Sequence, residues 1–195
     1  IDPADLGRQY EPIIRINSQS GKGGAAFVMR QAFGYQLPRA MHPEFGALVK
    51  EACELARREL TPEEVFAIFR REYLDVHHPY RLLTYRIFEE SGTGGQVQVD
   101  FEGIIRTHHV NKEVSGRGNG PIDAFFNALG AMGLRGYEFV SYSEHAVSTG
   151  ADSQAVSYIQ LRHQGEMVFG VGMDHNISIA SIKGITAKKA REIAD

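Results

Sequence analysis

Cysteine is almost absent from this sequence of 195 residues, because Cys53 is the only one. A single cysteine excludes an internal disulfide and fits a reducing compartment, so we expect the chain to be cytoplasmic. No apolar run approaches the length of a membrane span, and no signal-peptide pattern stands at the start. The net charge of −3 gives no sign of the basic face that nucleic-acid binders usually carry. We therefore expect neither a membrane nor a nucleic acid as a partner.

The sequence also lacks an initiator methionine. It begins Ile1-Asp2-Pro3, which is typical of the interior of a longer protein, so we expect a fragment. Hydrophobic residues make up 43% of the chain and charged residues 23%, which excludes a disordered chain. A chain of this length is long enough for one or two small domains with cores of their own.

The first part of the chain carries helical patterns. Residues 17–24 are polar and rich in glycine, and they predict a loop or hinge. Apolar side chains recur at helical spacing over residues 43–59. Thr61-Pro62-Glu63-Glu64 has the pattern of a capping box, with proline at the first helical position and glutamate at the third. This helical part is expected to end near residues 75–79, which we take as a candidate domain boundary.

Strand patterns replace the helical ones in the rest of the chain. Alternating apolar residues and turn signals predict three strands and a helix, followed by three further strands and a second helix. The expected strands span residues 82–89, 96–101, 104–114, 137–147, 154–162 and 166–171, and the expected helices span 122–132 and 176–193. Glu102-Gly103 is expected to form the turn between the second and third strands. The predicted fold class is therefore α+β, with a small helical subdomain followed by two βββα repeats.

A glycine-rich motif precedes each of the two predicted helices. Gly116-Arg117-Gly118-Asn119 and Gly170-Val171-Gly172-Met173 occupy equivalent places and are expected to form tight turns. The start of a helix offers unpaired N–H groups and a partial positive charge, which suit a phosphate or a carboxylate. A nucleotide loop would need G-x-G-x-x-G in a parallel unit, or Gly-Lys-Ser or Gly-Lys-Thr, and neither occurs here. The spacing alone leaves a purely structural turn equally open.

Two adjacent histidine pairs, His77-His78 and His108-His109, are the candidates for metal binding. Adjacent side chains diverge on a helix or a strand, so neither pair chelates an ion by itself. No H-x-x-x-H, H-x-H or cysteine cluster accompanies them, and we expect no metal site.

One polar region could form a catalytic set, from Glu144-His145, Ser148 and Asp152. No nucleophile-elbow motif supports this interpretation. An ordinary loop, or a loop that shapes a ligand pocket, is the expected role of the segment.

Motifs along the whole chain resemble the 2-isopropylmalate synthase family. They are IDPADLGR at residues 1–8, INSQSGKGG at 16–24, GRGNGP at 116–121 and YSEHA at 142–146. The resemblance implies a parent acyltransferase that condenses acetyl-CoA with 3-methyl-2-oxobutanoate, the first committed step of leucine biosynthesis. It also implies a divalent metal in an N-terminal TIM barrel that is absent here. We therefore expect no catalytic residue, no metal and no cofactor in this chain, and no activity from it alone.

The resemblance divides the chain into three parts. Residues 1–16 would be the end of a first linker subdomain, residues 17–80 a second, helical linker subdomain, and residues 81–195 a C-terminal regulatory domain. That domain is expected to form a homodimer, to bind leucine at the dimer interface and to mediate allosteric feedback inhibition. We expect the hinge at residues 17–21 to carry the coupling to the barrel.

The family motifs also indicate which residues line the leucine pocket. The candidates come from a helix start, the next strand and the loop beyond it: Asn119, Gly120, Ile122, Asp123, Ala124, Phe139, Tyr142, Ala146, Asp152, Ser153 and Ala155. A helix start suits the carboxylate of the effector, and apolar walls suit its aliphatic chain. Asp123 departs from the small residue that similar family members often have. We expect it to pair with the effector's ammonium group or to alter the choice of effector.

Two other functions remain open. The related citramalate synthase has a similar domain that senses isoleucine, although the NSQSGKGG motif argues against it. A stand-alone module that binds an anion or nucleotide at residues 116–120 is the third interpretation. The missing Walker lysine and the antiparallel setting of the strands argue against that module.

Overall fold

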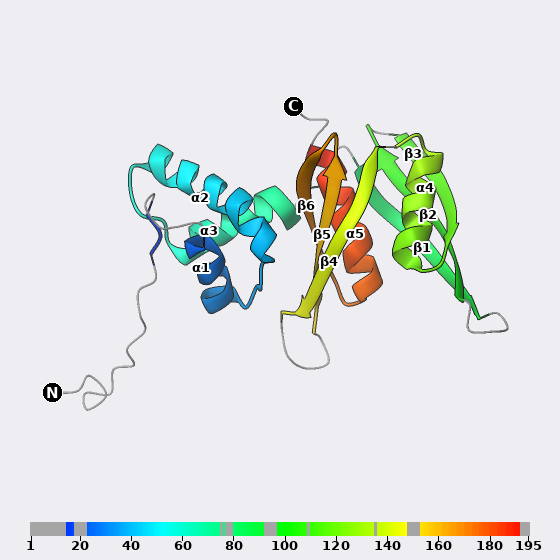
Figure 1. The fold of residues 1–195 in the computed structure, drawn as a ribbon, viewed down its shortest axis with the longest axis horizontal. Coiled ribbons are helices and arrows are strands. Elements are labelled where there is room, and N and C mark those ends of the chain that lie inside the picture. Colours follow the sequence, from blue (N-terminus) through cyan, green and yellow to red (C-terminus); the bar gives the residue numbers. More distant parts are fainter. Residues whose placement is uncertain are drawn as a thin grey trace.

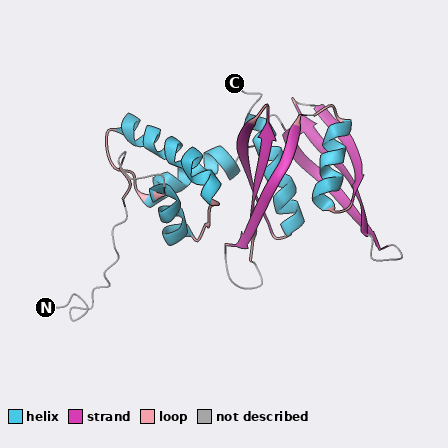
Figure 2. Ribbon diagram, viewed as in Figure 1, coloured by secondary structure: helices cyan, strands magenta, loops and turns pink. Residues whose placement is uncertain are grey.

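The computed structural model describes residues 15–17, 23–74, 76, 80–91, 97–108, 110–134, 136–147 and 153–191. These residues form a helical subdomain followed by two units of three strands and one helix (Figure 1, Figure 2). The α+β class and the two βββα repeats predicted from the sequence are confirmed.

Three α-helices build the helical subdomain. They are α1 (Gly24–Phe33), α2 (His42–Ala56) and α3 (Pro62–Phe69), with a 3-10 turn η2 (Arg39–Met41) before α2 and a π-helical turn η3 (Arg70–Leu74) after α3. Their core is aromatic, because Phe45, Phe69 and Tyr73 are buried and their rings contact one another. Such ring contacts stabilise a small core beyond the burial of apolar area alone.

The predicted capping box at the start of α3 is confirmed. The side-chain hydroxyl of Thr61 accepts the Glu64 N–H at 3.3 Å, and the Glu64 carboxylate accepts the Thr61 N–H at 2.9 Å. Pro62 takes the first helical position, where no N–H is needed. The local sequence therefore determines where this helix begins.

Each βββα repeat contains an antiparallel sheet with its strands in sequence order. The first repeat comprises β1 (Tyr80–Ser91), β2 (Val97–Thr107), β3 (Val110–Gly118) and α4 (Pro121–Ala131). The second comprises β4 (Tyr137–Ala146), β5 (Ala155–His163), β6 (Glu166–Asp174) and α5 (Ile177–Arg191). Both first strands have a β-bulge at the same place, between Leu82 and Thr84 and between Phe139 and Ser141. The repeated irregularity supports the internal repetition read from the sequence.

The predicted turn at Glu102-Gly103 is wrong, because β2 continues through it to Thr107. A Cβ on Gly103 would lie 2.9 Å from the Thr84 carbonyl oxygen and 3.0 Å from the Phe101 ring. The glycine therefore makes room for close packing within a strand and does not reverse the chain. The strand predicted at residues 104–114 is consequently divided between β2 and β3.

The predicted tight turns at the two glycine-rich motifs are also wrong. Their glycines lie in β3 and β6, and none has a positive φ. A Cβ on Gly116 would lie 2.2 Å from the Ala124 carbonyl oxygen, and one on Gly172 would lie 1.9 Å from that of Ala180. Each glycine therefore lets the helix of its repeat lie directly on the strand backbone.

The helices α4 and α5 lie between the two sheets (Figure 1). Helix α4 packs on β2 and β3, whereas α5 packs on β5 and β6 and also touches β1 and α4. The inner faces of both sheets share one core with these helices. The helical subdomain covers the outer face of the second sheet, where Tyr158 of β5 and Phe169 of β6 join its core.

Candidate functional site

The start of α4 leaves backbone N–H groups without helical partners. The N-cap residue Gly120 has no side chain, and Pro121 has no N–H. The Ala124 N–H donates the hydrogen bond to the Gly120 carbonyl, at 2.9 Å, that opens the helix. The N–H groups of Ile122 and Asp123 therefore precede the helical ladder and carry the partial positive charge of the helix start. Such a place binds carboxylates and phosphates.

Asp123 closes the turn that leads into α4. Its Oδ2 accepts the Asn119 N–H at 3.0 Å. The same oxygen lies close to the strand, since a Cβ on Gly118 would be 2.6 Å from it. The Asp123 carboxylate thus has a structural role at the helix start, where a negative charge also suits the helix dipole. Its pairing with an effector's ammonium group stays a prediction.

Strand β4 places three of the predicted pocket residues on one face. The bulge before Ser141 inserts an extra residue, so Phe139 and Tyr142 come to the same side. Their partners on β5 are buried in the core that contains α5. Ala146 lies further along the same face and pairs with Ala155, which is also a predicted pocket residue. The structure therefore gathers these residues along the inner side of the second sheet.

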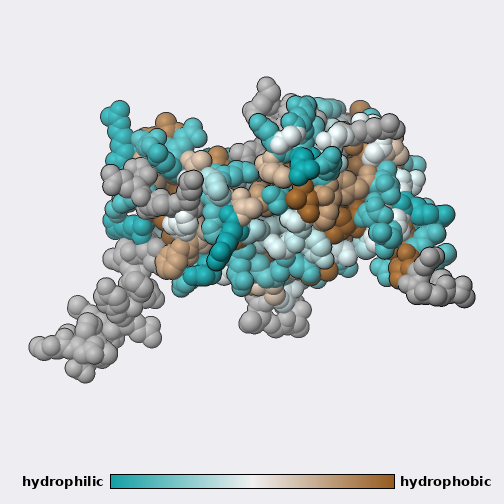
Figure 3. Space-filling model, viewed as in Figure 1, coloured by the Kyte–Doolittle hydropathy of each residue, from teal (hydrophilic) through white to brown (hydrophobic). Residues whose placement is uncertain are grey.

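An aromatic contact joins α4 to β4. The ring of Phe126 meets that of Phe139 edge-on with 6.0 Å between centroids, and the Phe139 ring lies 6.2 Å from that of Tyr142. Phe139 and Tyr142 are 41% and 51% exposed. Figure 3 shows apolar surface in this region, between β4 and α4. The contact joins the middle of α4 to the first half of β4.

Helix α4 and strand β4 run in opposite directions (Figure 1). One turn from Phe126 toward the helix start leads to Ile122, while the path along β4 from Phe139 leads to Tyr142. The start of α4, the end of β4 and the start of β5 consequently lie at the same end of the molecule, the lower end in Figure 1. The pocket residues predicted at the start of α4, the end of β4 and the start of β5 thus share this end, whereas Phe139 lies near the start of β4, toward the opposite end.

The loop between β4 and β5 carries the two remaining predicted residues. Asp152 lies outside the described residues, as does Ser148 of the catalytic set considered above. Ser153 lies two residues before the start of β5 at Ala155. The base of the loop is closed by a hydrogen bond from the Val147 N–H to the Gln154 carbonyl at 3.0 Å.

The sequence named Glu144 only in a possible catalytic set and missed it as a residue of the effector pocket. It lies between Tyr142 and Ala146 on the same face of β4, and it is exposed. Because side chains alternate along a strand, Glu144 follows as a pocket residue once Tyr142 and Ala146 have been assigned to the pocket. Phe126 was missed as well, because its helical spacing fits simple core packing equally well.

The start of α5 differs from that of α4, because side chains of the second repeat fill it. Asn176 Oδ1 accepts the N–H groups of Ser178, at 2.9 Å, and of Ile179, at 3.2 Å. Asp174 accepts the Asn176 N–H at 2.9 Å and pairs with the Lys183 ammonium at 2.6 Å. Burial acts to raise the pKa of Asp174, but these hydrogen bonds outweigh it and hold the pKa below its usual value. The open helix start is therefore a property of the first repeat.

Among the described residues, no three His, Cys, Asp or Glu side chains are placed to hold a metal ion. Of the histidine pairs, the structure describes only His108, which stands in the turn after β2 with φ 44°. Asn17 is likewise the only described residue of the hinge predicted at residues 17–21. Within the same described ranges, no helix combines the length and apolar character that crossing a membrane requires.

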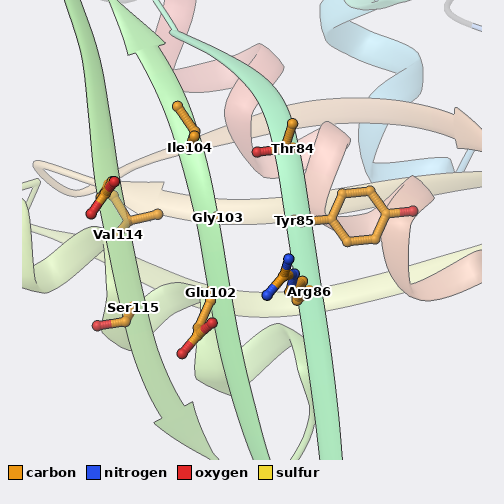
Figure 4. A pocket seen from close by; sticks show the side chains of 9 residues that line it. Thr84, Tyr85, Arg86, Glu102, Gly103, Ile104, Val114 and Ser115 are labelled. Carbon is orange, nitrogen blue, oxygen red and sulfur yellow. The ribbon is translucent and has the colours of Figure 1, made fainter.

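A shallow depression of about 670 Å³ lies on the outer face of the first sheet (Figure 4). Its walls include Arg86, Glu102 and Glu113. Glu102 and Glu113 occupy the positions that Tyr158 and Phe169 take beneath the helical subdomain in the second repeat. The depression is therefore an open, charged surface of the strands, on the side of the sheet away from α4. For this reason we place the candidate site at the start of α4.

The paired βββα units match a known family of domains. Residues 59–190 match the family described as LeuA allosteric (dimerisation) domain. Residues 1–30 match the family described as alpha-isopropylmalate synthase, post-catalytic domain-like. Most of the chain thus belongs to the family described as LeuA allosteric (dimerisation) domain, and its first residues match a family described as post-catalytic.

Relatives that match nearly all of this chain identify its family. The chain is 47% identical over 193 residues to 2-isopropylmalate synthase of Clostridium acetobutylicum, a match that covers 96% of this chain and 34% of the relative. It is 40% identical over 196 residues to the Pseudomonas fluorescens (strain SBW25) enzyme, covering 100% of this chain and 34% of the relative. The Corynebacterium efficiens enzyme is 38% identical over 193 residues, covering 99% of this chain and 33% of the relative. The chain belongs to the 2-isopropylmalate synthase family and spans about a third of the length of these relatives.

Proposed function

We propose that this chain is the leucine-sensing and dimerising part of a 2-isopropylmalate synthase. In this proposal the parent enzyme is a cytoplasmic acyltransferase that condenses acetyl-CoA with 3-methyl-2-oxobutanoate in leucine biosynthesis. Its divalent metal and its catalytic residues lie in a barrel outside this chain, and the chain alone is inactive. The observation that carries the proposal is the open start of α4, at the same end of the molecule as the end of β4.

Each group of a leucine molecule has a suitable partner at this site. The N–H groups of Ile122 and Asp123 at the helix start suit the carboxylate. Glu144, at the end of β4, supplies a negative charge for the ammonium group. The side chains of Ile122, Phe139 and Tyr142 supply apolar surface for the aliphatic chain.

Homodimerisation would bury the apolar surface that β4 leaves exposed. Phe139, Val140 and Tyr142 all stand among the exposed large apolar residues. Strand β4 is an edge of its sheet, whose order is β4-β5-β6. An edge strand with exposed apolar side chains is usually buried by another element or a partner. For a domain described as a dimerisation domain, that partner is a second copy of the chain. The effector would then bind beside the dimer interface.

Isothermal titration of the chain with leucine, isoleucine and valine tests this proposal. We expect leucine to bind most tightly, with one site per chain because side chains of the second repeat fill the start of α5. Tighter binding of isoleucine would favour the regulatory domain of a citramalate synthase. A melting shift with ATP or NAD, combined with none for leucine, would favour the anion-binding module.

A further inference from the structure

The two faces of β4 have different neighbours. Tyr142 and Ala146 lie on the face toward the candidate site, and His145 alternates to the opposite face. There the His145 Nε2 accepts the backbone N–H of Gln36 at 3.0 Å, and the imidazole stacks on Tyr158 with 5.7 Å between centroids. Gln36 follows α1 and lies 109 residues away in sequence. This hydrogen bond ties the strand of the candidate site to the helical subdomain.

The hydrogen bonds around His145 define where its proton lies. The Gln36 N–H can only donate, so Nε2 is unprotonated and the ring proton is on Nδ1. Nδ1 donates to the Ala146 carbonyl at 3.0 Å, and the Tyr158 hydroxyl donates to Nε2 at 3.2 Å. Burial, assisted by the nearby Tyr35, raises the pKa of Tyr158, so its hydroxyl keeps its proton. The imidazole is therefore held in one orientation by the strands and by the helical subdomain.

The segment that contains Gln36 contacts both the helical subdomain and the second sheet. Tyr35 packs its ring against Phe69 in the helical core, and its hydroxyl donates to the sulfur of Met173 on β6 at 3.5 Å. Gly34 lies beside the end of β4, since a Cβ there would be 3.6 Å from the Val147 carbonyl oxygen. A shift of the end of β4 consequently acts on the same few residues between α1 and η2.

We propose that His145 is a positioning residue that transmits occupancy of the effector site to the helical subdomain. This inference rests on the proposed function of that site. A ligand that contacts Tyr142 and Ala146 shifts the end of β4, and His145 moves with it because it belongs to the same short length of strand. The Gln36 N–H then changes its distance to the imidazole acceptor, which alters how firmly the segment after α1 is held.

Hydrogen exchange of the Gln36 amide, followed by NMR on the whole chain with and without leucine, tests the inference. Saturating leucine is expected to change the exchange rate of the wild-type Gln36 amide by about 5-fold or more, the size set by one hydrogen bond. His145→Leu removes the acceptor, so we expect the Gln36 amide to exchange about 5- to 10-fold faster and to ignore leucine. Because His145 faces away from the site, it makes no contact with leucine in this proposal, and leucine affinity should change by no more than the reciprocal coupling, the same factor by which leucine changes the Gln36 exchange rate in wild type.

Two further variants complete the design. His145→Gln keeps an acceptor oxygen and should recover part of the leucine response. Gln36→Ala is the matched control, because the hydrogen bond uses the backbone N–H, and it should keep the full response.

Three outcomes separate the possibilities. A leucine response at Gln36 that persists in His145→Leu overturns the inference. A wild-type Gln36 amide that leucine binding leaves unchanged also overturns it, whether or not the variants fold. A wild-type chain that binds no leucine overturns the proposed function, and this inference falls with it.

Discussion

Gly116 in β3 and Ala128 in α4 approach each other backbone to backbone, since a Cβ on Gly116 would lie 2.4 Å from the Ala128 nitrogen. Gly172 in β6 and Gly184 in α5 repeat this relationship, with 2.5 Å from a Cβ on Gly172 to the Gly184 nitrogen. The position of each helix on its sheet therefore depends on the absence of a strand side chain.

Gly116→Ala is expected to destabilise the chain by about 1–3 kcal/mol, because strand and helix must separate to admit the methyl group. Gly130→Ala is the matched control within α4, where a Cβ would meet no atom within 4 Å. That control should stabilise the helix by about 0.5–1 kcal/mol. Denaturant unfolding measures both changes, and wild-type stability in Gly116→Ala would contradict the close contact.

Glu144→Gln is expected to weaken leucine binding by about 10-fold, because it removes the charge-assisted hydrogen bond to the ammonium group. Glu138→Gln is the control on the same strand, since Glu138 is exposed and already pairs with Arg162 at 3.0 Å. Isothermal titration should find wild-type affinity in the control. Equal affinity in the two variants would remove Glu144 from the site.

The stability of α3 is expected to depend on pH through Glu64. Hydrogen bonds from the Arg58 guanidinium and the Thr61 N–H lower the pKa of Glu64 from 4.5 to about 2. Because the folded-state pKa is the lower one, the stabilisation is complete above pH 4.5 and is lost as the pH falls toward 2. The melting temperature of Glu64→Gln should therefore lie below that of wild type at neutral pH and approach it in acid.

A matched control for Glu64 is available in the same turn. Glu63→Gln also removes one carboxylate, but from an exposed residue outside the capping box. Its melting temperature should differ less from wild type. A difference for Glu64→Gln that stays constant from neutral pH to acid would contradict the account of this helix start.

Val140→Lys is expected to shift the chain from dimer to monomer, since it places a charge in the exposed apolar surface of β4. Leu55→Lys is the control, because Leu55 of α2 is 79% exposed and lies in the helical subdomain. Analytical ultracentrifugation distinguishes the two states. A dimer that survives Val140→Lys would place the interface elsewhere.

Local signals in the sequence were sufficient for much of the fold. Helical spacing predicted α2, the capping box predicted the start of α3, and the order of strand and helix patterns predicted both repeats. Each of these features is decided by residues a few positions apart. The turns predicted at the glycines were wrong because these positions are decided by residues far apart in the sequence. Whether Gly103 or Gly116 forms a turn depends on neighbours that reach it only after the chain has folded.

The candidate site was predictable only in part. Family motifs indicated the start of α4 and the face of β4, and the structure brings most described members of that set, though not Phe139, to one end of the molecule. The hydrogen bond that engages the Asp123 carboxylate and the exposed position of Glu144 needed the folded chain. The contact between Gln36 and His145 joins residues 109 apart, and no short-range pattern encodes such a pair.

The most direct test asks whether leucine binds at the start of α4. In an NMR titration of the chain, the amide signals of Ile122 and Asp123 should move and saturate at one leucine per chain. The amides of Ser178 and Ile179 should stay in place, because Asn176 already occupies them. Equal movement at both helix starts, or no movement at Ile122 and Asp123 while leucine binds, would contradict the account.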